Sequence, residues 1–276
     1  MTSTATTTLN YLLAPLDGSR PYTDINADTA NGKPVNNWLK DPHEMQIEDV
    51  RGKEELYKLD SAGFQYGREA PKHTSFLNDE EIEREYYPES IDLIKRVTGA
   101  TKVVIFDHTV RRRRPGELGN SPQKRQPVPQ AHVDQTPAAS VARVHRHLPP
   151  TEAPALLRRR FQIINLWRPI SHAAVDWPLA LCDFRSVDFE KDLTPVALIF
   201  PDREGETFGV KYNPNHQWKY LKGMTPEEFV LIKCSDSVQD GSVARLAAHT
   251  AFQDPNTPEG APPRESIELR TLVFYD

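Results

Sequence analysis

The sequence predicts a mainly β domain with flanking helices (α+β), whose second half forms an antiparallel barrel or jelly roll. The chain has 24 prolines against 13 glycines, and these residues separate short apolar runs. Such a composition is typical of many loops and short strands rather than of a helical bundle. With 276 residues, the chain is long enough to bury a sizeable core. We expect one domain over residues 1–276.

Three parts of this domain can be separated along the chain. Residues 1–45 are expected to form an irregular N-terminal arm, residues 46–125 to supply helices and strands that flank the barrel, and residues 126–276 to form the jelly-roll core. Short β-branched or alternating runs, separated by Pro and Gly, predict the core strands. The clearest of these strands lie at 161–170, 196–200, 230–234 and 264–275.

Helix signals precede and interrupt the strands. Asn78 or Asp79 is a suitable N-cap for a helical stretch that Pro88 continues, with apolar residues at helical spacing, and that ends at Gly99. A β-branched run over 102–108 then predicts a buried strand. We expect these elements to pack beside the barrel.

Charge and hydropathy exclude several function classes. The 34 basic and 39 acidic residues are intermingled and give a net charge of −5, without the basic field that nucleic-acid binding needs. No apolar run approaches the ~20 residues of a membrane span, and the N-terminus lacks the pattern of a secretory signal. The two cysteines, Cys182 and Cys234, predict no disulfide framework. We therefore expect a cytoplasmic protein that binds neither nucleic acid nor membranes, and a homodimer is left open.

A His-x-Asp pattern near the middle of the chain is the first candidate for a chemical site. His132 and Asp134 are two residues apart, so on a strand their side chains point to the same side. They would supply two ligands of a 2-His-1-carboxylate triad, which is the ligand set of non-haem Fe(II) oxygenases. By itself the pattern also fits a strand with two hydrogen-bonded polar residues.

A third ligand and an anion-binding strand occur more than a hundred residues later. His249 lies among small and apolar residues, and the last strand alternates so that Arg264, Ser266, Glu268 and Arg270 share one face. If this face is buried, its arginines need an anionic partner, because unpaired buried charge is costly. A dicarboxylate would provide it, with Arg264 binding one carboxylate through two hydrogen bonds and Ser266 donating its hydroxyl.

The order of these motifs resembles that of Fe(II)/2-oxoglutarate-dependent oxygenases. More closely, the chain is similar to the fungal hydroxylase/desaturase family of asaB-like and CmcJ-like proteins, which includes aziridine-forming enzymes of the TqaL type. The resemblance covers about residues 45–276, most of the chain. It rests on Tyr86–Glu89, Thr98–Ala100, Val104–His108, His132–Thr136, Asn165–Pro169, Pro178–Asp183, His249–Phe252 and Arg264–Arg270.

The resemblance implies a double-stranded β-helix (jelly-roll) core and a defined set of cofactors. Fe(II) would be held by His132, Asp134 and His249, while 2-oxoglutarate, the co-substrate, would be bound by Arg264 and Ser266. With O2 as oxidant, the implied activity is C–H oxidation of a small molecule by hydroxylation, desaturation or oxidative cyclisation such as aziridine formation. We expect no catalytic side chain beyond these binding groups.

Further polar residues are expected to contact the substrate, namely Asn165, Arg168 and Arg270, together with the arginine run Arg111–Arg114. The interval between the third ligand and Arg264 is longer than this superfamily usually shows, so Arg270 is the alternative 2-oxoglutarate anchor. The many arginines favour a carboxylate-bearing substrate, such as a secondary-metabolite precursor or an amino acid.

Two other function classes use the same residues. A zinc hydrolase can bind its metal through two histidines and a carboxylate, although the chain has no His-Glu-x-x-His helix to supply a general base. A non-catalytic jelly-roll protein could bind a small molecule, but it would leave the arginine and serine face without an anionic partner. Binding of Fe(II) together with 2-oxoglutarate separates the three classes.

Overall fold

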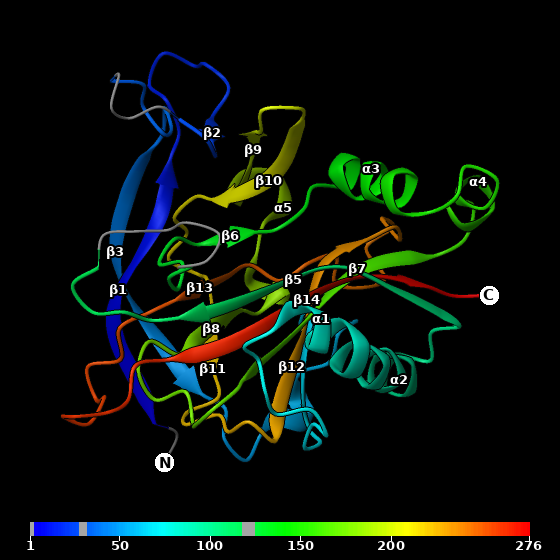
Figure 1. The fold of residues 1–276 in the computed structure, drawn as a ribbon. Helices are drawn as coiled ribbons and strands as arrows, with labels where there is room; N and C mark the ends of the chain where they lie inside the picture. The colour runs from blue at the N-terminus through cyan, green and yellow to red at the C-terminus, as the bar shows by residue number, and fades with distance from the viewer. Residues whose placement is uncertain (1–2, 28–31, 118–124) are drawn as a thin grey trace.

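The computed structural model describes residues 3–27, 32–117 and 125–276, and most of its regular elements are strands (Figure 1). The strands are β1 (Thr4–Leu13), β2 (Tyr22–Asp24), β3 (Leu39–Asp49), β4 (Phe64–Arg68), β5 (Lys102–Arg112), β6 (His132–Val133), β7 (Phe161–Pro169), β8 (Leu179–Cys182), β9 (Leu193–Ile199), β10 (Glu204–Val210), β11 (Trp218–Tyr220), β12 (Glu228–Asp236), β13 (His249–Ala251) and β14 (Glu265–Phe274). The helices are α1 (Asp79–Glu81), α2 (Tyr87–Thr98), α3 (Pro137–His147), α4 (Ala153–Leu156) and α5 (Phe189–Asp192), with 3-10 turns at η2 (Glu54–Leu56) and η4 (Phe184–Ser186) and a π-helical turn at η3 (Ile82–Tyr86).

The strands form two sheets that face each other. One sheet has the order β1-β3-β11-β8-β13-β6-β10-β9-β2, and the other has the order β4-β12-β7-β14-β5. Ile163 and Trp167 of β7 and Val230 of β12 share one apolar core with Leu181 of β8, so residues of both sheets meet in the interior. Side chains from opposite sheets can therefore build one site between them.

The last strand alternates as predicted. Leu272 and Phe274 of β14 belong to the core between the sheets, whereas Ile267 and Leu269 belong to a second core on the other face. Because successive side chains on a strand alternate, the even-numbered residues of β14 face the inter-sheet space. Arg264, immediately before β14, precedes the polar residues Ser266, Glu268 and Arg270 of this face.

Helices α1 and α2 cover the outer face of the five-stranded sheet. Asn78 is the N-cap, since its Oδ1 accepts a hydrogen bond from the backbone N–H of Glu81 at 3.2 Å. The helical stretch continues through η3 and ends at Gly99, whose φ of 74° is left-handed. Ile82 and Ile94 pack there with the outer residues of β7, β12 and β14. None of the helices in the described residues is long and apolar enough to cross a membrane.

The N-terminal segment differs from the irregular arm predicted for residues 1–45. β1 is ten residues long and pairs antiparallel with β3, so that Thr4 lies opposite Glu48. Figure 1 shows the two strands running together along one side of the molecule. Ala5, Leu9 and Tyr11 are buried at alternating positions, and the threonines between them favour extended backbone. The predicted arm is therefore wrong for this stretch, while the extent of the single domain stays a prediction.

A buried ion cluster connects β12 to the loop that precedes β4. The ammonium group of Lys233 is fully buried and lies 2.7 Å from Asp60 Oδ1 and 2.8 Å from Asp236 Oδ2. We expect Lys233→Met to lower the free energy of unfolding by about 2 kcal/mol, because the buried carboxylate of Asp236 loses one of its two cationic partners and keeps only Arg160 among the described residues. Urea unfolding monitored by circular dichroism measures the change.

The matched control is Lys191→Met, since Lys191 is exposed and, within the described part of the chain, its one ion pair is with Asp188 at 2.7 Å. Its effect should stay within about 0.5 kcal/mol. Equal unfolding midpoints for the two variants would contradict the structural role of Lys233.

Candidate metal centre

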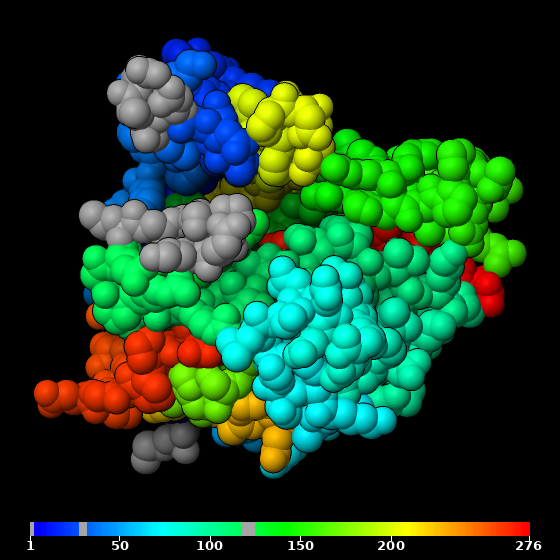
Figure 2. All heavy atoms as spheres, in the orientation of Figure 1, coloured from blue at the N-terminus to red at the C-terminus, as the bar shows by residue number. Residues whose placement is uncertain are grey.

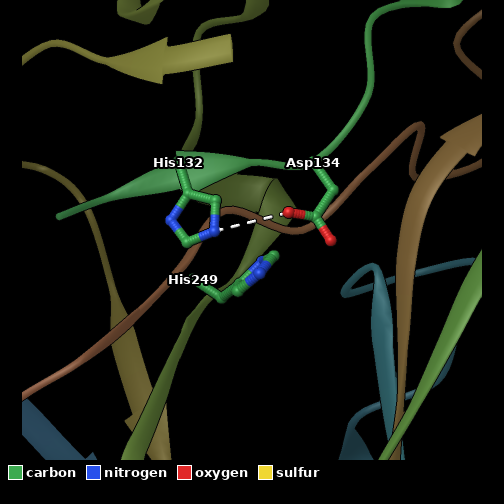
Figure 3. Close-up of side chains that lie close together, drawn as sticks. All are labelled: His132, Asp134 and His249. Atoms are coloured by element: carbon green, nitrogen blue, oxygen red, sulfur yellow. Dashed lines mark ion pairs between the residues drawn. The ribbon is translucent and has the colours of Figure 1, made fainter. Parts of the chain in front are cut away.

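Two histidines and one aspartate meet on adjacent strands of the nine-stranded sheet. His132 begins β6, Asp134 follows the end of β6, and His249 begins β13, where the strand register places it opposite His132. One ligand atom from each side chain lies within 4.8 Å of the other two. His132 Nε2 is 3.4 Å from Asp134 Oδ1, and the imidazole centroids are 4.4 Å apart. Figure 3 shows the three side chains converging, so the structure brings the predicted ligand set together.

Backbone carbonyls orient both imidazoles for metal binding. His132 Nδ1 lies 2.7 Å from the carbonyl oxygen of Gln130, and His249 Nδ1 lies 3.2 Å from that of Ala247. A carbonyl can only accept, so each Nδ1 carries the proton and each Nε2 keeps its lone pair. Metal-binding histidines typically have this second hydrogen bond. The donor set, two imidazole nitrogens and one carboxylate, therefore fits Fe(II).

The five-stranded sheet holds the aspartate from the other side. Asn165 Nδ2 donates to Asp134 Oδ2 at 2.7 Å, and Arg270 Nε lies 3.4 Å from the same oxygen. Burial alone would raise the pKa of Asp134, but the charge of Arg270 outweighs burial and keeps the pKa well below its usual value. The carboxylate is therefore charged, and Oδ1 faces the histidines.

Asn165 is therefore a positioning residue for the aspartate, and its removal can be measured. We expect Asn165→Leu to weaken Fe(II) binding about tenfold. This is the lower end of the effect of losing a hydrogen-bond partner of a metal ligand, because Arg270 still contacts the same oxygen of Asp134. Competition with a fluorescent chelator under anaerobic conditions gives the affinity. Thr271→Val is the control, since it removes another buried hydrogen bond, from Thr271 Oγ1 to Ile164 at 2.7 Å, on the opposite strand face. Equal Fe(II) affinity in the two variants would contradict the role of Asn165.

A second group of charged side chains lines the cavity beside the three ligands. Arg264, Arg270 and Glu268 of the β14 segment line it with Arg111 of β5 and Trp167 of β7. Arg264 is 2% exposed, and its guanidinium lies 5.6 Å from the centre of the Trp167 ring. Ser266, also buried, lies opposite Arg111 in the strand register. Among the described residues that line the cavity, the carboxylates of Asp134 and Glu268 both pair with Arg270, so Arg264 and Arg111 can bind a further anion.

Arg264 and Arg270, the two candidate anchors for 2-oxoglutarate, have different surroundings. Arg270 lies 2.7 Å from Asp107, 2.8 Å from Glu268 and 3.4 Å from Asp134, and these carboxylates raise its pKa although burial opposes them. Arg264, by contrast, makes no ion pair with any described residue. Burial, together with the charge of the nearby Arg111, lowers the pKa of Arg264 to about 9.

A strained turn fixes the position of Arg264. Its Nη1 donates to the carbonyl of Trp177 at 2.6 Å, and its backbone N–H donates to Asp176 Oδ2 at 3.0 Å. Trp177 has a φ of 46°, an uncommon value for a bulky side chain and one that is often found at functional sites. Asp176 is held in turn by Arg113 Nη1, which is 3.0 Å from both carboxylate oxygens. The Nε of Arg264 is buried without a partner among the described residues, so it can still donate to a ligand.

Arg168, one of the expected substrate contacts, lies away from the site. Arg168 points to the outer face of the five-stranded sheet, where its Nη1 donates to the carbonyls of Glu69 and Pro226 at 2.9 and 3.0 Å. It lies three positions after Asn165 on β7, and an odd separation places two side chains on opposite faces. Its predicted contact with substrate is therefore wrong. Asn165 and Arg270 are at the site, but both contact Asp134.

The arginine run Arg111–Arg114 is divided between different surroundings. Its first two residues end β5, and only Arg111 lines the cavity. Arg112 lies 3.3 Å from Glu265, and Arg113 binds Asp176. Arg111 is therefore the residue of this run that can contact a molecule in the cavity. The role of Asp176 was not predicted, because nothing in the local pattern indicates that it contacts Arg113 and Arg264.

Known proteins are similar in sequence to this chain over nearly its whole length. A family model described as "Oxidoreductase/YMDC permease-like domain" matches residues 9–274. The hydroxylase/desaturase efuI of Hormonema carpetanum is 34% identical over 294 residues, covering 99% of this chain and 96% of efuI. The Fe(II)/2-oxoglutarate-dependent dioxygenase nvfI of Aspergillus novofumigatus is 34% identical over 247 residues, covering 86% of this chain and 84% of nvfI. The chain belongs to this family of Fe(II)/2-oxoglutarate-dependent oxygenases.

The fold of the oxygenase agrees with this membership. A solved structure of a variant of the iron and alpha-ketoglutarate-dependent endoperoxidase NvfI superimposes with a TM-score of 0.86 at 30% identity and covers 99% of both chains. The predicted jelly-roll fold, the Fe(II)/2-oxoglutarate-dependent dioxygenase activity and the cofactors Fe(II), 2-oxoglutarate and O2 are thereby confirmed. The zinc-hydrolase and binding-protein alternatives are set aside.

Proposed function

We propose that the oxygenase oxidises a C–H bond of a small, carboxylate-bearing molecule, with His132, Asp134 and His249 holding Fe(II) and Arg264 and Ser266 binding 2-oxoglutarate. The observation that carries this proposal is the convergence of the three ligand atoms within 4.8 Å of one another, beside a buried arginine without an ion pair among the described residues. The substrate is a secondary-metabolite precursor or an amino acid.

Each residue of the proposed site has one task. Bound Fe(II) and 2-oxoglutarate supply the oxidation of the substrate by O2, with release of succinate and CO2. His132 and His249 present Nε2 because backbone carbonyls hold their Nδ1 protons. Asn165 and Arg270 occupy one oxygen of Asp134 and leave the other for the metal.

We assign the binding of the 2-oxoglutarate carboxylate to Arg264 rather than to Arg270. Arg270 already contacts three carboxylates, whereas Arg264 keeps a buried Nε without a partner among the described residues. A carboxylate placed there gains charge-assisted hydrogen bonds and relieves the repulsion between Arg264 and Arg111. Trp167 lines the same cavity and lies against the Arg264 guanidinium.

Turnover with candidate substrates tests the proposed activity. Protein reconstituted with Fe(II) or with Zn(II) is incubated in air with 2-oxoglutarate and a panel of amino acids, small organic acids and the neutral amides of these acids. With Fe(II), at least one acid should increase succinate formation and yield a product heavier by one oxygen, or lighter by two hydrogens. A product that instead gains water and forms with Zn(II) would contradict the proposal, as would a panel in which only neutral compounds react.

The setting of the reaction is also part of the proposal. The family acts on small molecules, and we infer that this member works in the cytoplasm, without nucleic-acid or membrane partners, as a monomer or a homodimer. Size-exclusion chromatography with light scattering distinguishes these two states.

A further inference from the structure

A second, larger pocket adjoins the metal centre, and Arg264 is not among the residues that line it. It has a volume of about 370 Å³, within the range of small-molecule sites, and lies between α3 and the β9–β10 hairpin. Figure 2 shows these two elements next to each other on the surface, the hairpin in yellow and the helix in green. Asp134 lines both this outer pocket and the inner cavity. A molecule in the outer pocket would therefore approach the metal ligands without occupying the site of 2-oxoglutarate.

The lining of the outer pocket changes along its length. Near Asp134, the pocket-facing side of α3 carries Ala138 and Ala142, and Leu198 and Phe200 lie across from them on the hairpin. These short or apolar side chains leave room for the apolar body of a ligand. One and two turns further along the same face of α3, the lining residues are Arg143 and Arg146 instead of alanines.

Two arginines of α3 and one of the β9–β10 hairpin form a cationic end of the pocket. Arg143 and Arg146 make no ion pair with any described residue, and Arg203 pairs only with its exposed sequence neighbour Asp202 at 3.0 Å. Burial lowers the pKa of Arg143, and the charges of Arg146, Arg270 and Arg203 lower it further. An anion between these guanidinium groups would relieve that repulsion.

The two glutamates that also line this pocket do not neutralise the cluster. Arg20 lies 2.7 Å from Glu204 and 2.8 Å from Glu206. Glu206 also accepts a hydrogen bond from the hydroxyl of Thr136 at 2.6 Å. Both carboxylates thus already have partners, Arg20 and Thr136, that do not belong to the arginine cluster.

We infer that the outer pocket is the substrate site and that it takes an organic acid with an apolar body, whose carboxylate binds Arg143 and Arg146 while its far end lies at Asp134. This inference rests on the proposed function, because it places the C–H bond that is oxidised beside the metal ligands. It assigns the recognition of the substrate carboxylate to α3, rather than to Arg168 or Arg270.

Anaerobic calorimetry of the protein loaded with Fe(II) and 2-oxoglutarate tests the assignment. Loading fills the inner cavity, so that an added acid cannot bind there. The probes are octanoate, 4-phenylbutyrate and N-acetylphenylalanine, each compared with its primary amide. At least one acid should bind saturably and about tenfold more tightly than its amide, since charge-assisted hydrogen bonds are replaced by neutral ones.

Variants of the two α3 arginines test whether the preference for the acid over its amide arises in the outer pocket. In Arg143→Gln/Arg146→Gln the preferred acid should bind about tenfold more weakly, and no better than its amide. The single variant Arg158→Gln removes an exposed arginine that does not line the pocket, and it should bind as the wild type does. A double variant that retains the preference for the acid would overturn the inference, and so would a wild type that binds none of the three acids or binds acid and amide alike.

The visible absorption of the loaded protein separates this test from that of the proposed function. If the charge-transfer band of bound Fe(II) and 2-oxoglutarate does not form, the proposed function fails. If the band forms in the wild type and the double variant but no acid is preferred, only the assignment of the outer pocket fails.

Discussion

His249→Ala should abolish stable Fe(II) binding and, with it, the formation of succinate. His249 is one of three ligands, and loss of an outer partner of a ligand alone weakens metal binding by about tenfold to a hundredfold. We therefore expect the affinity for Fe(II) to fall by more than about a hundredfold. Iron retained after anaerobic gel filtration measures binding, and succinate measures turnover. His132→Ala should have the same effect, because the two imidazoles face each other across β6 and β13.

His145→Ala is the matched control, since His145 is an exposed histidine of α3 that does not line the metal centre. It should retain iron at wild-type stoichiometry. If His249→Ala kept one iron per chain while its circular dichroism spectrum was unchanged, the metal would have to bind elsewhere.

Arg264→Leu should raise the KM for 2-oxoglutarate by about a hundredfold while Fe(II) binding remains. The leucine removes a buried cation that, in the proposed site, binds one carboxylate of the co-substrate through two charge-assisted hydrogen bonds. Arg264→Lys should recover part of the affinity, because a lysine keeps the charge but not the planar pair of donors. Succinate formation at varied 2-oxoglutarate concentration gives KM.

Arg270→Leu separates the two candidate anchors. Because Arg270 contacts Asp134 and Glu268, its loss should weaken Fe(II) binding as well as 2-oxoglutarate binding. The reverse pattern, in which Arg270→Leu raises only the KM for 2-oxoglutarate and Arg264→Leu leaves it unchanged, would make Arg270 the anchor.

The parts of the site that follow from strand periodicity could be predicted from the sequence. His132 and Asp134 lie on the same side because they are two residues apart, and the polar face of β14 follows from simple alternation. The same rule, applied to β7, separates Asn165 from Arg168, which explains why only Asn165 reaches the site. The irregular arm was predicted because polar threonines obscured an alternation that buries Ala5, Leu9 and Tyr11.

Long-range register and the partners of charged residues could not be read from the sequence. Nothing local indicates that His249 pairs opposite His132, or that Arg270 and Asn165, opposite each other on β14 and β7, both reach Asp134 across the space between the sheets. The choice between Arg264 and Arg270 likewise depends on which carboxylates surround each guanidinium. These contacts are set by tertiary packing rather than by local propensity.

We propose that one Fe(II) and one 2-oxoglutarate bind together at His132, Asp134, His249 and Arg264. The decisive experiment is anaerobic titration of 2-oxoglutarate into the Fe(II)-loaded wild-type protein, followed by visible spectroscopy. We expect a metal-to-ligand charge-transfer band that saturates at one equivalent of each per chain. A well-folded protein that binds iron but develops no band at any 2-oxoglutarate concentration would contradict it.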